Sequence, residues 1–395
     1  MTTYRILVLN HIASTGLHRF PPARYVVDRA VEHPDAILVR SHDMHGMAIP
    51  QSVRAIGRAG VGTNNIPVTQ LSTRGIPVFN APGANANAVK ELVLAALLLA
   101  ARNVIPALGY VGSLERDAPD LEHRVEAGKK QFAGVELPGR TLGIVGLGAI
   151  GGLVADAAIK LGMNVTGFDP EITVEAAWRL PSTVRKAHSI EELLKQSDFV
   201  TLHVPLSDVT RQLINEQRLA AMKPGAALLN FARDAIVDVA AVRTALRTHR
   251  LKSYLCDFPS EALLAEPGVV ALPHLGASTE EAEENCAIMV ADQVREFLEH
   301  GTIVNAVNFP SVEMPRESPY RVAIANANVP NMLGQMSTAM ARAGLNIHNM
   351  VNKSRGETAY TLVDVDSQVP PPLIDALAAI EGVLSVRAIP AEPLE

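Results

Sequence analysis

The sequence is poor in cysteine and in aromatic residues, and it lacks a long apolar run. Its two cysteines, Cys256 and Cys286, are too few for a disulfide framework and favour a reducing compartment. Aromatic residues make up 4% of the chain but apolar residues 48%, which excludes a wholly disordered chain and predicts a core of aliphatic side chains. The longest apolar run, residues 92–101, has ten residues, whereas a membrane-spanning helix needs roughly 20.

The sequence also lacks a basic run and a leader. With 35 Lys and Arg against 41 Asp and Glu, the net charge is −6, so broad binding to nucleic acid or to an anionic membrane is not expected. The N-terminal MTTYRILVLN lacks the pattern of a signal peptide and is predicted to be a first β-strand. We therefore expect a cytoplasmic protein of two or three domains, with neither nucleic-acid nor membrane partners.

What the sequence does contain is a regular alternation of short apolar runs and helical patterns. Residues 4–89 include RILVLN, AILVR, AIGRAGVG and IPVFNAPG, which are typical of buried parallel strands joined by helices. A helix is predicted over 91–102, and βα units then repeat from TLGIVG to VVALPH, with Ser189 as a helix N-cap and Gly162 as a helix stop. A helix predicted over 279–300 is long enough to return the chain to the first region.

A different pattern follows at the C-terminus. Pro310, Pro315 and Pro319 punctuate a polar stretch over 311–318, which we predict to be a linker. The remaining residues predict the order βαββαβ, with Pro371 and Pro372 at the start of the last helix. The expected fold class is α/β, with two doubly wound parallel-sheet (Rossmann-like) domains and a small C-terminal βαββαβ domain.

One motif points to a nucleotide. Gly146, Gly148 and Gly151 form a G-x-G-x-x-G between a predicted strand and a helix predicted over 150–161, and Asp169 lies 23 residues after Gly146. Such glycines allow a tight turn and close approach to pyrophosphate, while the carboxylate can accept a ribose hydroxyl. Because no Arg or Lys follows Asp169 directly, NAD is favoured over NADP. A ligand-free turn and a site for adenosylmethionine are the alternatives, and no metal site is predicted.

Several segments together resemble the D-2-hydroxyacid dehydrogenase family. They are VGLGAIG, Asp169, TLHVPL, LLNFARD, DFPSE and PHLGAST. The N-terminal VRSH, GRAGVGTNNI and APGANANAVKELV are similar to the D-3-phosphoglycerate dehydrogenases within that family. The last region resembles an ACT domain, a small ligand-sensing module.

The resemblance implies a division of the chain and a reaction. It implies a split substrate-binding domain over 1–90 and 280–310, an NAD-binding domain over 91–279, the linker over 311–318, and an ACT regulatory domain over 319–395, with nicotinamide and substrate in a cleft between the first two. The implied reaction is NAD-dependent oxidation of 3-phospho-D-glycerate to 3-phosphooxypyruvate, the first step of L-serine biosynthesis. A related reductase of glyoxylate, hydroxypyruvate or 2-oxoglutarate, or a non-catalytic NAD(H)-sensing protein of the same fold, remains an alternative.

The same resemblance implies catalytic and cofactor residues. His274 would be the acid/base, Glu261 its orienting partner and Arg233 the anchor of the substrate carboxylate and carbonyl, which are roles that suit an imidazole, a carboxylate and a guanidinium. The implied cofactor-binding residues are Gly146, Gly148, Ala149, Ile150, Gly151, Asp169, His203, Val204, Pro205, Ala232, Asp257 and Gly276. The chain departs from the family by carrying Asp234 after Arg233 and by a shorter step from Asp257 to Glu261.

The same resemblance implies substrate-binding and effector-binding residues. The implied substrate-binding residues are Arg40, Ser41, Arg58, Val61, Gly62, Asn85 and Lys129, the last supplied by a neighbouring subunit of a homodimer or homotetramer. Each of these cations could instead be a solvated surface charge. The implied effector ligands, typically for L-serine, are Asn326, Asn328 and Asn346. Asn326 and Asn331 depart from the His and Gly familiar at their positions, and a purely structural dimerisation module is the alternative.

Overall fold

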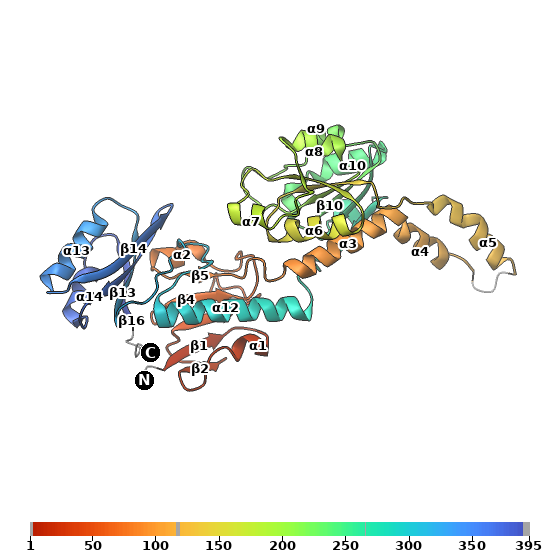
Figure 1. Cartoon of the computed structure of the whole chain (residues 1–395). Coiled ribbons are helices and arrows are strands. Elements are labelled where there is room, and N and C mark those ends of the chain that lie inside the picture. The colour runs from red at the N-terminus through yellow and green to blue at the C-terminus, as the bar shows by residue number, and fades with distance from the viewer. Residues whose placement is uncertain (1–2, 116–118, 265, 390–395) are drawn as a thin grey trace. The chain divides into compact units, whose positions relative to one another are not determined.

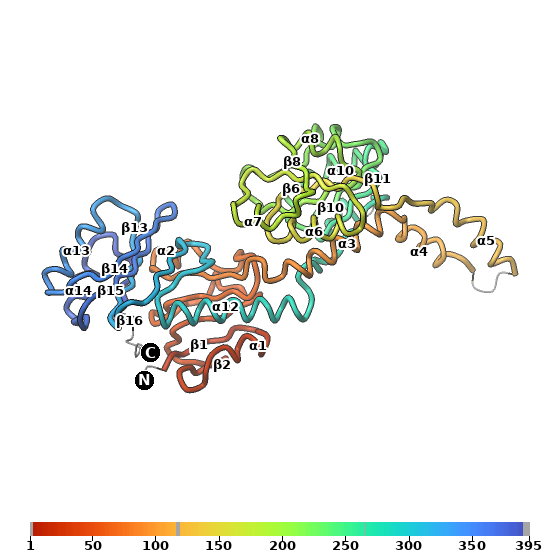
Figure 2. The backbone as a smooth tube through the Cα atoms, in the orientation of Figure 1, coloured from red at the N-terminus to blue at the C-terminus, as the bar shows by residue number. Residues whose placement is uncertain are grey.

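The computed structural model describes residues 3–115, 119–264 and 266–389. The chain divides into two compact units, which can be followed along the backbone in Figures 1 and 2. Unit 1 consists of Met1–Asn85 together with Glu280–Glu395, and unit 2 is Ala86–Thr279. The long helix that begins unit 1's second segment does return the chain to the first region, as its length predicted.

Unit 1 contains a five-stranded parallel sheet in the order β2-β1-β3-β4-β5. Its strands are β1 (Tyr4–Val8), β2 (Tyr25–Asp28), β3 (Ala36–Val39), β4 (Ala55–Arg58) and β5 (Val78–Phe79). Its helices are α1 (Ser14–Leu17), α2 (Val68–Thr73) and α12 (Glu280–His300).

Both faces of this sheet are buried, as a continuous run of apolar residues in β3 requires. Leu38 lies in one hydrophobic core with Val290 and Val294 of α12. Its neighbour Ile37 points to the other face and packs in a second core with Leu71 of α2. The alternation of a strand therefore divides unit 1 into two apolar layers.

Unit 2 contains a seven-stranded parallel sheet in the order β12-β11-β10-β9-β6-β7-β8. Its strands are β6 (Thr141–Val145), β7 (Asn164–Phe168), β8 (Arg185–Lys186), β9 (Phe199–Leu202), β10 (Ala226–Asn230), β11 (Leu251–Cys256) and β12 (Val269–Ala271). Its helices are α3 (Ala86–Arg102), α4 (Val104–Gly112), α5 (Leu121–Gly128), α6 (Ala149–Lys160), α7 (Val174–Trp178), α8 (Ile190–Gln196), α9 (Glu216–Ala221), α10 (Val239–Arg247) and α11 (Glu261–Leu264), with 3-10 turns η1 (Lys129–Phe132) and η2 (Asp234–Ile236).

This sheet also separates two apolar layers. Leu229 packs with α3 and α6 residues, and Leu228 packs with α8, α9 and α10 residues on the opposite face. The predicted cap at Ser189 is confirmed, because its hydroxyl accepts a hydrogen bond from the Glu192 N–H at 3.1 Å. The predicted doubly wound parallel sheets are thus present in both units.

Helices α4 and α5 form an arm that extends from the rest of unit 2 (Figure 1). The sequence analysis did not predict these helices. None of the α4 residues is buried, although Ile105, Leu108 and Val111 are apolar. Within the described ranges no single helix is long and apolar enough to cross a membrane, and only the bent pair α3 and α4 meets the length and composition limits when taken together.

The C-terminal part of unit 1 has the predicted order βαββαβ. Its strands are β13 (Tyr320–Ala327), β14 (Ile347–Arg355), β15 (Thr358–Val365) and β16 (Val383–Ile389), and its helices are α13 (Met332–Arg342) and α14 (Pro371–Ala378). The antiparallel sheet has the order β14-β15-β13-β16. Val322 and Ile324 face α13 and α14, while Ala323 and Ala325 share the core of α12. One face of the small sheet is therefore part of the main core of unit 1.

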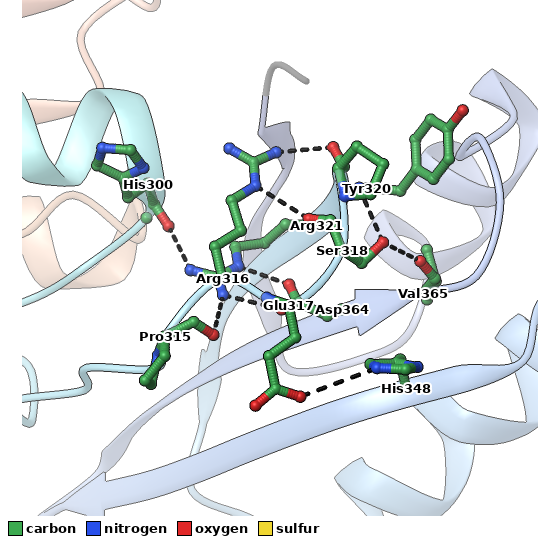
Figure 3. Close-up of polar contacts among 12 residues, drawn as sticks. His300, Pro315, Arg316, Glu317, Ser318, Tyr320, Arg321, His348, Asp364 and Val365 are labelled. Atoms are coloured by element: carbon green, nitrogen blue, oxygen red, sulfur yellow. Dashed lines mark hydrogen bonds and ion pairs between the residues drawn. The ribbon is translucent and has the colours of Figure 1, made fainter. Parts of the chain in front are cut away.

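A buried ion pair and a packed segment join the small sheet to α12. Arg321 donates to both carboxylate oxygens of Asp364, at 2.6 and 2.9 Å, and to the backbone oxygens of His300 and Pro315 (Figure 3). Residues 311–318, predicted as a polar linker, pack against the rest of unit 1. Val312 is fully buried, and the Ser318 hydroxyl donates a hydrogen bond to the Val365 carbonyl.

Candidate functional site

The predicted cofactor and catalytic residues of unit 2 lie at the carboxyl ends of its strands. In the sheet order, β6 lies between β9 and β7, so the chain reverses direction across the sheet beside β6. Ligands of open parallel sheets bind at the carboxyl ends beside such a point. The glycine loop follows β6, Asp169 follows β7, His203 follows β9, Arg233 follows β10 and His274 follows β12.

The three glycines of the loop after β6 meet three different constraints. Gly146 has φ +91°, and a Cβ there would lie 2.5 Å from the His203 carbonyl oxygen. A Cβ on Gly151 would lie 2.0 Å from the Gly146 oxygen, because α6 packs directly on the loop. A Cβ on Gly148 would meet nothing within 4 Å. The space beside Gly148, at the N-terminus of α6 where Ala149 and Ile150 begin the helix, fits an anionic group.

Asp169 is tied to the same loop. Its Oδ2 accepts from the Leu147 N–H at 2.8 Å and its Oδ1 from the Glu171 N–H at 3.0 Å. The carboxylate is therefore oriented beside the glycine turn, and each oxygen keeps a lone pair for a further donor. A ribose role for Asp169 stays a prediction.

His203 holds a neutral imidazole beside the loop. Its Nε2 shares a hydrogen bond of 3.0 Å with the Thr201 hydroxyl, while its Nδ1 is buried without a partner among the described residues. Burial lowers the pKa of His203 to about 3. The next residues also contact structural neighbours, since the Pro205 carbonyl accepts from the Thr210 hydroxyl and Val204 approaches Gly146.

Asn230, a fully buried residue at the end of β10, shapes the turn that carries Arg233. Its Oδ1 accepts from the Ala232 N–H at 3.1 Å, and its Nδ2 donates to the Arg233 carbonyl at 2.8 Å. The exposed Arg233 donates from Nη1 to the Ala232 oxygen, which leaves other donors of its guanidinium available. The Asp234 carboxylate accepts from the Ala235 N–H at 2.7 Å.

Asp257 holds the turn that carries His274. Its two oxygens accept from the N–H groups of Leu275 and Gly276, both at 2.7 Å, and the side chain is 2% exposed. His274 itself is exposed, has φ +57°, and lies edge-on to the Phe258 ring, with centroids 5.2 Å apart. The Asp257 carboxylate, which was predicted to bind the cofactor, therefore accepts hydrogen bonds from the backbone that orients the His274 imidazole.

Glu261 begins α11 and is exposed. Although both residues are described, the structure gives no hydrogen bond or ion pair between the Glu261 carboxylate and His274. Their pairing stays a prediction. Likewise, no group of three or more His, Cys, Asp or Glu able to hold a metal occurs in the described part of the chain.

In unit 1, two predicted substrate cations lie at the carboxyl ends of β3 and β4. Strand β1 lies between β2 and β3, so the direction of strand addition reverses there. Asn10, which follows β1, accepts from the Arg40 N–H at 3.2 Å and donates to the Ser41 hydroxyl at 2.7 Å. The Arg40 guanidinium pairs with Glu283 of α12 at 2.6 Å, so a substrate anion would compete with that carboxylate.

Arg58 lies beside Arg40. Its Nε donates to the Arg40 carbonyl at 3.0 Å, and its guanidinium passes so close to Gly60 that a Cβ there would lie 1.8 Å from Nη1. Two other predicted residues belong to unit 1. The Val61 carbonyl, before Gly62, accepts from the Asn80 side chain at 2.6 Å, and the Asn85 Oδ1 is buried without a partner in the described chain.

The remaining predicted residues lie elsewhere. Lys129 is exposed on η1 of unit 2 and pairs with Glu126. Asn326 is 1% exposed and donates to the Ala327 oxygen, while its Oδ1 finds no partner among described residues. Asn328 and Asn346 are exposed. The side-chain amide of Asn328 and the backbone N–H of Asn346 each donate a hydrogen bond within the C-terminal part.

Comparison with known proteins gives this arrangement a family. Residues 108–276 match the model of the D-isomer specific 2-hydroxyacid dehydrogenase, NAD binding domain. A D-3-phosphoglycerate dehydrogenase of Haemophilus influenzae is 34% identical over 348 residues, covering 85% of this chain and 81% of the relative. The chain belongs to the D-isomer specific 2-hydroxyacid dehydrogenase family.

Other members agree with this assignment. A D-3-phosphoglycerate dehydrogenase of Methanocaldococcus jannaschii is 39% identical over 268 residues, which cover 66% of the chain described here and 49% of the relative. The crystal structure of a cofactor (NAD+) bound 3-phosphoglycerate dehydrogenase of Entamoeba histolytica has a TM-score of 0.59 and 25% identity, covering 78% of this chain and 99% of that one. The resemblance predicted from sequence motifs is thereby confirmed.

Three residues that the sequence analysis missed position the predicted ones. Asn10 and Asn80 follow a strand and Asn230 ends one, and each bonds with the backbone or hydroxyl of a predicted site residue. The available signal was an Asn directly after an apolar run, in RILVLN, IPVFN and AALLN. Asn side chains at such positions commonly bond with nearby backbone.

Proposed function

We propose that this dehydrogenase oxidises 3-phospho-D-glycerate to 3-phosphooxypyruvate with NAD, the first step of L-serine biosynthesis, in the cytoplasm. The observation that carries the substrate is the pair Arg40 and Arg58 at the carboxyl ends of the neighbouring strands β3 and β4. The Arg58 side chain donates a hydrogen bond to the Arg40 carbonyl. A substrate with a phosphate and a carboxylate needs more than one such cation. The relatives named D-3-phosphoglycerate dehydrogenase support the same substrate, and the two free, buried cysteines suit the cytoplasm.

The nucleotide side supports NAD. The open space beside Gly148 and the first turn of α6 would hold the pyrophosphate. The Asp169 carboxylate would accept from the adenosine ribose and repel a 2′-phosphate, because Pro170, Glu171 and Ile172 supply no cation beside it. When bound, NAD supplies the hydride acceptor.

The protein's own residues then handle the proton and the substrate charge. The His274 imidazole takes the proton of the substrate hydroxyl, and the turn fixed by Asp257 sets the direction of the ring. Arg233, held by Asn230, binds the substrate carboxylate and polarises the adjacent oxygen. Once the Glu261 carboxylate contacts the His274 ring, it stabilises the imidazolium.

A substrate panel tests this function. The purified full chain is mixed with NADH and phosphohydroxypyruvate, glyoxylate, hydroxypyruvate or 2-oxoglutarate, and NADH absorbance is followed. We expect kcat/KM to be highest for phosphohydroxypyruvate, and Arg58→Gln to reduce that preference by at least about tenfold, the worth of one charge-assisted contact. Preference for an unphosphorylated oxoacid would identify a related reductase, and NADH binding without turnover would identify a sensing protein.

The exposed apolar residues of α4 support a homo-oligomer, a homodimer or a homotetramer. Leu108 is 63% and Val111 57% exposed, and neighbouring apolar side chains on a protruding helix are typical of a subunit interface. Lys129, further along the arm, would supply a charge to a neighbouring subunit. Leu108→Lys should reduce the molar mass in light scattering, whereas Leu161→Lys, an exposed leucine after α6, should not; an unchanged mass in both would contradict the arm interface.

The C-terminal part of unit 1 is, in this proposal, an ACT domain that senses L-serine. The buried, unpartnered Oδ1 of Asn326 and the exposed Asn328 and Asn346 support it, since amide groups suit a zwitterionic amino acid. L-Serine should lower turnover in the full chain and lose that effect in Asn328→Ala. Equal turnover with and without L-serine would leave the domain a structural dimerisation module.

A further inference from the structure

Unit 1 carries a pocket of about 450 Å³ between β16 of the small sheet and the loops that lead into β4 and β5. Its wall comes from the segment before β4, the turn between α2 and β5, α12 and β16. Three arginines line it, Arg54, Arg74 and Arg387, and the described lining includes no Asp or Glu. The pocket is separate from the residues at the carboxyl ends of the strands, and the proposed reaction does not use it.

Arg387 places a charge in this pocket without a carboxylate beside it. Its guanidinium carbon lies 4.1 Å from the centroid of the Phe297 ring, and its Nη2 donates to the Phe297 carbonyl at 2.9 Å. Over the described ranges no ion pair joins Arg387 to any acidic group. Burial, and to a lesser extent the charge of Arg54, lowers the pKa of Arg387. A buried charge of this kind is normally balanced by a counterion.

The other two arginines leave the pocket with excess positive charge. Arg74 donates to the neutral carbonyls of Ile49 and Pro50, at 3.1 and 2.8 Å. Arg54 is 3.6 Å from the Asp35 carboxylate, which is the only acidic partner that the described structure gives to the three cations. Three positive charges against one negative charge leave a net charge of +2.

The pocket is also preformed. Gly75, with φ +68°, lies so close to β16 that a Cβ there would lie 2.5 Å from the Ser385 hydroxyl oxygen, and that hydroxyl donates to the Gly75 carbonyl at 3.2 Å. The cation–π contact with the Phe297 ring holds Arg387 in place. Preformed positions reduce the ordering cost when a ligand binds.

We propose that this pocket binds a phosphate group, either as inorganic phosphate or as part of a small phosphomonoester. A phosphate dianion balances the net charge of +2, and the flat fork of a guanidinium matches phosphate oxygens in a bidentate manner. The volume lies within the range of sites for small ligands. Because the pocket is lined by both sheets of unit 1, its ligand links the C-terminal part to the substrate-binding part.

The test first removes the two other proposed phosphate sites: Arg58→Gln weakens the substrate site, and saturating NAD fills the space beside Gly148. In full-length Arg58→Gln, inorganic phosphate is titrated by calorimetry at constant ionic strength, with KCl as the compensating salt. We expect this variant to retain one saturable binding event. Adding Arg387→Met, which preserves an apolar stem over Phe297, should weaken that event at least about tenfold, the worth of one charge-assisted contact.

Matched variants make the result decisive. Arg54→Gln, at an exposed side chain, should weaken phosphate binding in the same way, and it replaces Arg387→Met if that variant does not fold. Arg342→Met, in the last turn of α13, is the control and should leave phosphate binding unchanged. Glycerol 3-phosphate and 3-phosphoglycerate, titrated in parallel, distinguish free phosphate from a phosphomonoester. Undiminished binding in the folded Arg54 or Arg387 variant, or no saturable event in Arg58→Gln, would overturn the proposal, and neither result depends on turnover.

Discussion

At the residue scale, the backbone at His274 fixes the direction of the side chain that we propose as the acid/base. Its φ of +57° is a left-handed conformation that favours glycine, and it costs a histidine about 1–2 kcal/mol. The Asp257 carboxylate stabilises the turn by accepting from the next two N–H groups. Retention of such strain is typical of residues that must point in one direction for function.

His274→Ala should therefore lower turnover by about 100- to 10,000-fold, because the proton acceptor is lost. NADH binding, measured by fluorescence, should persist, since the glycine loop is untouched. His249→Ala is the control: His249 also has a positive φ, +56°, but follows α10. Full turnover in His274→Ala would remove the acid/base assignment.

His203 predicts a pH dependence of stability. Its pKa is about 3 in the fold against 6.5 ordinarily, so the unfolded chain binds a proton below about pH 6.5 that the folded chain does not bind until about pH 3. The free energy of unfolding should thus fall as the pH falls from 6.5 toward 3, by at most about 1.4 kcal/mol per pH unit for this group. Urea unfolding of His203→Gln between pH 7 and pH 4 should show a shallower decline; an identical decline would contradict the assignment.

At the element scale, the β6–loop–α6 unit assigns different roles to two glycines that a motif search treats alike. The Cβ position of Gly148 is open, whereas that of Gly151 lies 2.0 Å from a backbone oxygen. The first glycine leaves room for a ligand and the second lets the helix pack. Of the two, only the second is needed for α6 to pack this closely on the loop.

Gly148→Ala should leave the melting temperature nearly unchanged while weakening NADH binding, because the added methyl group occupies the ligand's space. Gly151→Ala should instead lower the melting temperature by several degrees, since overpacking typically costs about 1–3 kcal/mol. Thermal unfolding and NADH fluorescence, measured on both variants, check the pair. The same effect from both substitutions would count against the distinction.

At the scale of the whole molecule, a buried arginine of the C-terminal sheet, paired with an aspartate of the same sheet, also contacts the rest of unit 1. The side chains of Arg321 and Asp364 are 1% and 0% exposed, and the arginine also binds the carbonyl at the end of α12. Breaking one partner leaves a buried charge uncompensated. The ion pair joins β13 and β15 within the C-terminal sheet, and the bond from Arg321 to the His300 carbonyl ties that sheet to α12.

Asp364→Ala should lower the free energy of unfolding of unit 1 by about 3–5 kcal/mol. The same change at Asp156, whose exposed pair with Lys160 spans one helical turn, should cost less than about 1 kcal/mol. Urea denaturation of both variants gives the comparison. A loss at Asp364 no larger than that at Asp156 would show that the buried pair does not stabilise the C-terminal sheet.

The sequence by itself determined what depends on neighbours along the chain. The alternation of strands and helices, the glycine loop and the βαββαβ order were predictable because turns, caps and periodic apolar faces are local. The packed segment over 311–318 was harder to predict, since Val312 and Met314 are buried by residues distant in sequence.

Only the tertiary structure decided which side chains come together. The contacts of Asn10 with Arg40 and Ser41, of Asp257 with Leu275 and Gly276, and the gathering of Arg54, Arg74 and Arg387 around one pocket join residues far apart in the chain. Such contacts arise because parallel strands bring their carboxyl ends to one edge of a sheet, and because a buried polar group must find its partner wherever the packed fold supplies one.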